Sequence, residues 1–540
     1  METYVGDEER EGSVDANMES EPFLTPTPSS TPWVAPKGFV WIEVAIFANV
    51  FLSGFDGTIT ASTYAVISSE FNAANNASWL TTSYLITSTA FQPLYGRFSD
   101  IFGRRSCFFT STIAFMLGCL GCALAPDIVF LNLMRAVTGL GGGGLMTMAT
   151  IINSDMIPFK DRGMYQAVQN VLHGFGSICG ASLGGSIADT IGWRWCFLLQ
   201  VPVSILALIV GHLVVKNQTH YDNSDYETSP KATLSAIWNR VDLSGAFLLI
   251  IGLSIQLVGL NLGGNELPWS SPWVILSLVA SVLILGLFLY VEATTSAMPV
   301  IPLHMLRGKL AVSAQISNIC VGLAAYADSA STAGARLIIP SLAAPVGGVI
   351  SGFVMSRWGQ LANLVRLGAL LMFIGNALVM LLGFDSAKWK YITYIIPASL
   401  GQGIVYPAIL FTVLAAFGHS DHAVSASTVY LIRSLGTVWG VAITSAITQN
   451  TLKRRLPEAL IGIPNKWKII EEIRHSVLTI GKLPADAQMA ARQVYHDGIN
   501  LSFAVSAGFG FIATVSALFA SGKGLSRASS GDTRMAASGS

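Results

Sequence analysis

The chain has 540 residues, of which 52% are hydrophobic and only 11% charged, and its 31 Lys and Arg residues balance 31 Asp and Glu residues. Soluble globular proteins usually carry about 25% charged residues, so this composition argues against a soluble enzyme and indicates a protein embedded in lipid. A neutral chain without a basic block also lacks the electrostatic signature of a nucleic-acid-binding protein.

Residues 1–38 are acidic, then rich in Ser, Thr and Pro, which predicts a disordered tail. Fourteen apolar runs follow, and each is about 17 to 25 residues long, enough to cross a ~30 Å hydrocarbon core as a helix. They lie within 39–67, 79–95, 107–125, 128–152, 167–188, 197–215, 241–262, 273–291, 309–327, 334–355, 361–384, 391–417, 424–448 and 498–521. We therefore predict an all-α membrane protein.

Basic residues mark alternate connections, with Arg97, Arg104 and Arg105 after the second run and Lys160 and Arg162 after the fourth. Positive loops stay in the cytosol, which predicts that both termini are cytosolic.

Asn76 begins an Asn-Ala-Ser sequence in a connection on the opposite side and is a candidate glycosylation site. The segment 451–497 departs from the alternation, because it is rich in Lys and Arg yet is assigned to the outer side. Either it forms an external domain, or one upstream run does not cross. The shortest candidate is the ninth run, at 309–327.

The chain contains a short internal repeat. Gly96 to Gly103 follows the second run, and a segment with the same glycine spacing, Gly352 to Gly359, follows the tenth. Such repeats are typical of transporters that bind substrate near the bilayer midplane. The predicted units are an N-terminal six-helix half, a cytosolic loop, an inserted helix pair, a C-terminal half with an extramembrane loop, and a cytosolic tail. Their bounds are 39–215, 216–240, 241–292, 293–521 with 451–497 as the loop, and 522–540.

Three charged residues inside apolar runs are singled out as candidates: Asp56, Arg135 and Arg433. A carboxylate inside a membrane span is costly unless it is paired, solvated or protonated, so Asp56 marks a candidate proton or ion path. A helix-kink hydrogen bond beside neighbouring glycines is the alternative role. An arginine does not deprotonate and must find a carboxylate, carbonyls or water, so a static structural pairing stays open for both arginines.

The sequence gives no sign of enzyme chemistry. No Gly-x4-Gly-Lys-Ser/Thr sequence occurs, so ATP is not expected to drive this chain directly. We find no metal-ligand cluster and no catalytic constellation, and we expect no cofactor.

The sequence GRFSDIFGRR at 96–105 resembles the loop signature of the major facilitator superfamily, and residues 131–139 resemble its arginine-bearing motif. Residues 176–185 are similar to the glycine-rich antiporter motif, with Ala181 in place of the usual proline. The surroundings of Asp56 resemble the acidic signature of the fourteen-span drug:proton antiporter branch. WLTTSYLITSTAFQPLYGRFSD and GGGGLMTM further resemble fungal members, including vacuolar basic amino-acid transporters.

The resemblance implies a major facilitator fold of two six-helix halves plus an inserted pair. It also implies three groups of functional residues. Asp56, Arg135 and Arg433 would act in proton coupling, and Gly96, Asp100, Gly103, Arg104 and Arg105 would form a conformational loop. Gly176, Gly180, Gly184 and Gly185 would form the antiporter glycine motif.

The implied function is proton-coupled export of small organic or cationic solutes, such as drugs, toxins or metabolites, by alternating access. The proton gradient would supply the energy. The plasma membrane is the favoured location, and a vacuolar basic amino-acid/proton antiporter is the alternative. The ninth run is shorter than in typical family members, so a non-transporting relative is a third possibility.

Overall fold

The computed structural model describes residues 35–71, 79–215, 242–263, 267–295, 297–306, 308–330, 338–384, 386–418, 421–461, 466–467, 469–470 and 483–520. Most of the predicted tail 1–38 lies outside these described residues. The predicted loop 216–240, the tail 522–540 and Asn76 lie outside them as well.

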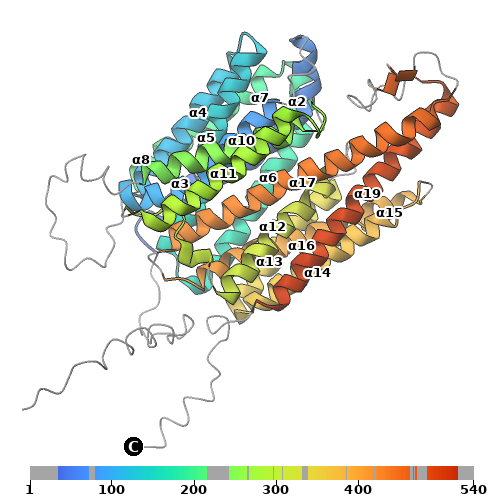
Figure 1. The fold of residues 1–540 in the computed structure, drawn as a ribbon. Helices are drawn as coiled ribbons and strands as arrows, with labels where there is room; N and C mark the ends of the chain where they lie inside the picture. Colours follow the sequence, from blue (N-terminus) through green and yellow to red (C-terminus); the bar gives the residue numbers. More distant parts are fainter. Residues whose placement is uncertain are drawn as a thin grey trace, which may run out of the picture.

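The described chain is built almost wholly from helices (Figure 1). The N-terminal half contains α2 (Phe39–Glu70), α3 (Trp79–Phe102), α4 (Arg104–Ala123), α5 (Ile128–Met156), α6 (Phe159–Thr190), α7 (Arg194–Leu198) and α8 (Gln200–Val214). The inserted pair is α10 (Leu243–Leu262) and α11 (Pro272–Thr294), followed by the short 3₁₀ helix η1 (Leu303–Leu306). The C-terminal half contains α12 (Lys309–Ala330), α13 (Ile338–Trp358), α14 (Leu361–Met380), α15 (Lys388–Thr393), α16 (Ile396–Leu414), α17 (His422–Ala459) and α19 (Ala485–Leu518).

Within the described residues, the fourteen predicted runs fall on these helices, the sixth on α7 with α8 and the twelfth on α15 with α16. Among the described residues, 11 helical segments are long and apolar enough to cross a membrane. Helices α3, α12 and α13 are not among them, and the apolar part of α12 is the shorter segment Lys309–Ala324. The all-α fold is thus confirmed, whereas the number of crossings stays a prediction.

Burial explains how a polar helix such as α3 fits into the bundle. Its Thr82, Ser88 and Thr89 are buried, and the helix packs against α5 and α17 rather than facing outward. By contrast, α11 carries large exposed apolar side chains, including Trp273 and Leu283. In a membrane protein such a face contacts lipid.

The two halves pack mainly within themselves and meet along two helix pairs, α3 with α17 and α6 with α13 (Figure 1). Helices α10 and α11 pack against each other, and α10 also lies against α3. The inserted pair therefore covers the bundle from outside and does not separate the halves.

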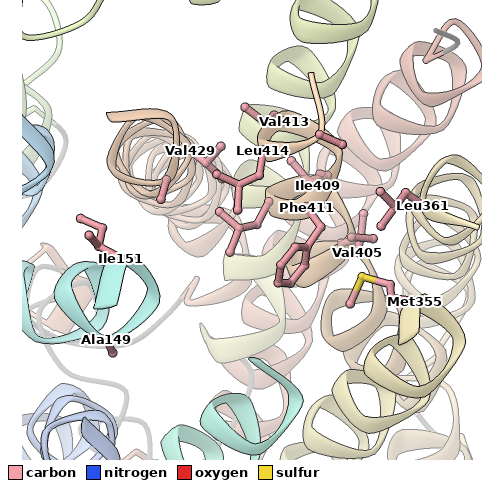
Figure 2. Close-up of a cluster of buried hydrophobic side chains, with 14 of the residues drawn as sticks. Ala149, Ile151, Met355, Leu361, Val405, Ile409, Phe411, Val413, Leu414 and Val429 are labelled. Atoms are coloured by element: carbon pink, nitrogen blue, oxygen red, sulfur yellow. The ribbon is translucent and has the colours of Figure 1, made fainter. Parts of the chain in front are cut away.

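The largest apolar cluster joins the halves, and a smaller one brings Leu94 of α3 together with Leu431 of α17. The largest cluster includes Ala149 and Ile151 of α5, Val405 and Phe411 of α16, and Val429 of α17 (Figure 2). Near the opposite end the clusters belong to a single half. One contains Phe55, Ile59 and Trp193, and another contains Val379, Ile395 and Phe503. Within the described residues, the halves thus share a core toward the arginine-rich end, which the charge pattern assigns to the cytosol.

Candidate functional site

Asp56 of α2 and Arg135 of α5 form an ion pair in the interior of the N-terminal half. Nη1 of Arg135 lies 2.8 Å from Oδ1 and 2.9 Å from Oδ2 of Asp56. The side chain of Asp56 is 0% exposed and that of Arg135 is 1% exposed. The structure therefore brings together two of the three charges that the sequence singled out.

The surroundings of the pair exclude water and complete its hydrogen bonds. Nε of Arg135 donates to the carbonyl oxygen of Leu80 at 3.2 Å, and Nε2 of Gln200 donates to Oδ1 of Asp56 at 3.4 Å. The rings of Tyr84 and Phe197 flank the guanidinium, with centroids 4.7 and 5.6 Å from its Cζ. A buried pair of this kind is stable only while both charges are present, because removing either leaves the other uncompensated.

The glycine motif holds α6 against the helix that carries Asp56. A Cβ at Gly180 would overlap the carbonyl oxygen of Phe55 and the hydroxyl of Thr58, and Gly176 and Gly184 also approach α2 closely. Thr58 Oγ1 donates to the carbonyl oxygen of Ser177 at 2.8 Å. A Cβ at Gly185 would meet no atom within 4 Å, so this glycine does not take part in the contact.

The segment 96–105 is not the loop that the sequence predicted. Helix α3 continues through Gly96 and Asp100 to Phe102, and α4 begins at Arg104. Only Gly103 breaks the helix, with a φ of 88° that favours glycine. Gly96 lies within α3 and against α17, where a Cβ would overlap the hydroxyl of Ser427. The prediction took a charged helix end, which extends past the apolar run, for a connection.

Arg104 is the centre of a polar cluster at this helix break. Its Nη1 lies 2.6 Å from Oδ1 of Asp100 and 2.7 Å from Oγ of Ser99, and its Nε lies 2.7 Å from Oδ2 of Asp155. Arg105 instead contacts His212 at the surface. The cluster ties the end of α3 to the end of α5.

Arg433 of α17 lies apart from the Asp56–Arg135 pair, in the C-terminal half. Its Nη2 donates to the carbonyl oxygen of Tyr406 at 2.9 Å, and its Nε donates to Oδ1 of Asn318 at 3.4 Å. Within the part of the chain that the structure describes, it forms no ion pair. Arg135 is neutralised inside its half, and Arg433 is not.

Glu43 of α2 was not singled out by the sequence reasoning. It is 4% exposed, and its one hydrogen bond in the described structure is a long one, 3.4 Å, from Nδ2 of Asn153. An acidic residue in an apolar run is the same signal that identified Asp56, and it could have found Glu43. Gln200 carried no such signal, because its role depends on which helix lies beside it.

The profile of the Major Facilitator Superfamily matches residues 46–441. The chain belongs to this superfamily. A vacuolar basic amino acid transporter of Saccharomyces cerevisiae is 46% identical over 73% of this chain and 86% of its own length. The multidrug resistance protein fnx1 of Schizosaccharomyces pombe is 34% identical over 86% of this chain and 89% of its own.

A solved structure supports the superfamily fold. The proton:xylose symporter XylE superposes with a TM-score of 0.54 at 15% identity, covering 89% of this chain and 94% of the symporter. At this identity the likeness concerns the fold alone. The protein is thus a multi-pass major facilitator transporter, as its sequence motifs predicted.

Proposed function

We propose that the protein is a proton-coupled antiporter that moves a small organic solute, foremost a basic amino acid, from the cytosol into an acidic compartment. The buried pair of Asp56 and Arg135 carries this proposal. The proton gradient supplies the energy, with no cofactor and no ATP.

The pair links proton binding to conformation. A proton on Asp56 removes the negative charge, while Arg135 keeps its positive charge because a guanidinium does not deprotonate in proteins. An uncompensated buried charge costs several kcal/mol, so protonation favours any arrangement in which Arg135 reaches other acceptors or water. Proton binding thereby shifts the balance between two arrangements of the helices, which alternating access requires.

The glycine contact gives α2 a path for such a shift. Gly176, Gly180 and Gly184 place the backbone of α6 directly against α2. With few side chains interlocked, the two helices can slide past each other at low cost. In this proposal, Asp56 moves with α2 when its proton is exchanged.

Two substrate classes are candidates. The 46% identical yeast relative is named a vacuolar basic amino acid transporter, which supports a basic amino acid and a vacuolar location. The relative named a multidrug resistance protein supports drug efflux at the plasma membrane, the function that the sequence motifs alone favoured. In both candidate functions the two termini of the chain lie in the cytosol.

The test is uptake by the full-length protein reconstituted in acid-inside vesicles, with arginine and a lipophilic cationic dye as solutes. The variants are Asp56→Asn and, as the matched control, Asp189→Asn, an exposed acid of the same helical bundle. We expect accumulation by the wild type and the control that stops when an ionophore collapses the gradient. We expect none by Asp56→Asn.

The outcomes separate the candidates. Accumulation of arginine favours the vacuolar function, and accumulation of the dye favours efflux. Gradient-driven accumulation by Asp56→Asn at the wild-type level would refute the coupling role. If the wild type accumulates neither solute, the result favours a non-transporting relative, the alternative suggested by the short ninth run.

A further inference from the structure

Arg433 lies where the two halves of the transporter face each other. Two residues close to it on α17, Tyr430 and Ser434, reach across to the N-terminal half. The hydroxyl of Tyr430 is 2.8 Å from that of Thr150 on α5, and Ser434 Oγ donates to Oε1 of Gln92 on α3 at 2.9 Å. Tyr430 and Arg433 are three positions apart and share a helix face, so Arg433 lies on the side of α17 that borders the surface between the halves.

The position of Arg433 along α17 places it deep in the membrane. The residue lies about 16 Å along α17 from His422, the first residue of the helix. A hydrocarbon core is about 30 Å thick, so this position is near its midplane. Transporters built from two related halves bind their substrates at this depth.

The guanidinium is held in place but keeps binding capacity. Its Cζ lies over the rings of Tyr406 and Tyr430, 4.1 and 5.3 Å from their centroids. Its two hydrogen bonds go to neutral acceptors, a carbonyl and an amide. Nη1 has no acceptor among the described residues, and the side chain is partly exposed.

We propose that Arg433 binds the carboxylate of the transported solute. An arginine near the midplane is costly without a counter-charge, and none of the described residues supplies one. A carboxylate from the solute would neutralise it and accept two parallel N–H bonds from the planar guanidinium. The inference rests on the proposed transport function and narrows its substrate to amino acids over lipophilic cations, which have no group for Arg433.

The test compares arginine with arginine amide, which has nearly the same size but no carboxylate. Exchange of labelled for unlabelled solute across vesicles without a proton gradient measures binding and turnover separately from proton coupling. We expect the wild type to prefer arginine by about 10- to 100-fold, the value of one or two charge-assisted hydrogen bonds. Arg433→Gln should abolish this preference, and Arg433→Lys should leave a smaller one.

Arg366→Gln is the matched control, because Arg366 also bonds to backbone carbonyls but at the far end of the C-terminal half, near Ala517 and Ala520. It should retain the full preference. Thermal stability in detergent shows whether each variant is folded, and Arg433→Lys decides the outcome if Arg433→Gln does not fold. An equal preference of the wild type for arginine and its amide would overturn the inference. So would a full preference in Arg433→Gln or, if that variant is unfolded, in Arg433→Lys.

The two proposals fail in different ways. If exchange discriminates between the solutes but a proton gradient drives no accumulation, the coupling function fails and the carboxylate site stands. If the gradient drives arginine and its amide equally, the function stands and the carboxylate site falls. If the wild type exchanges no amino acid, the carboxylate site and the basic amino-acid function are both wrong.

Discussion

Replacing Asp56 by Asn should destabilise the protein as well as uncouple it. The change keeps the shape of the side chain but leaves Arg135 charged in a site where it is 1% exposed. Breaking a buried pair by removing one partner costs about 3 to 5 kcal/mol, because the remaining charge stays desolvated. The two short contacts between Arg135 and Asp56, at 2.8 and 2.9 Å, and the flanking aromatic rings show that this is a buried pair of this kind.

The double variant Asp56→Asn/Arg135→Gln separates charge from packing. It removes both charges, so we expect it to regain most of the lost stability while proton-driven transport stays absent. The assay is the free energy of unfolding of each variant in mixed detergent micelles. The control is Glu70→Gln, which breaks the exposed pair with Arg194 and should cost no more than about 1 kcal/mol.

Two results would refute this reasoning. One is a single variant within about 1 kcal/mol of the wild type, which would mean that water reaches Arg135 freely. The other is a double variant no more stable than the single one, which would mean that the loss comes from packing rather than from an unpaired charge.

Three further predictions concern other parts of the molecule. Gly180→Ala should cost about 1 to 3 kcal/mol of stability, because the added Cβ would overlap α2. Gly185→Ala should not destabilise the protein, and equal losses of the two variants in a thermal unfolding series would contradict this prediction. Arg104→Gln should cost about 1.5 to 3 kcal/mol through its buried carboxylate bonds, against less than about 1 for Arg105→Gln, and the same unfolding assay compares them. Glu70 lies beyond the apolar span, at the end of α2, and the hydrogen bond from Arg194 lowers its pKa. This pair therefore stabilises the fold at pH values above the ordinary carboxyl pKa. That contribution is lost as the pH falls through the lowered pKa, and a stability difference between the wild type and Glu70→Gln that grows on acidification would be the wrong sign.

The sequence was sufficient for the fold and the family, because apolar runs of spanning length and their motifs are local signals. It also identified Asp56 and Arg135 separately, since any charge in such a run needs an explanation. Their pairing was not predictable, because the residues are 79 positions apart and come together only through the packing of α2 on α5. The helical state of Gly96 was missed because hydropathy marks where the lipid ends, not where the helix ends.

The long helices near the C-terminus have a practical consequence for imaging. Helix α17 has 38 residues and so is about 57 Å long, well beyond a ~30 Å hydrocarbon core. Its last turns pack against the start of α19 through Leu452, Leu456, Ala487 and Ala491 (Figure 1). A detergent micelle hides most features of a small transporter, but a paired-helix projection of this kind stands clear of it. It offers a rigid landmark for particle alignment in electron cryomicroscopy and an epitope for antibody fragments that leaves the space between the halves untouched.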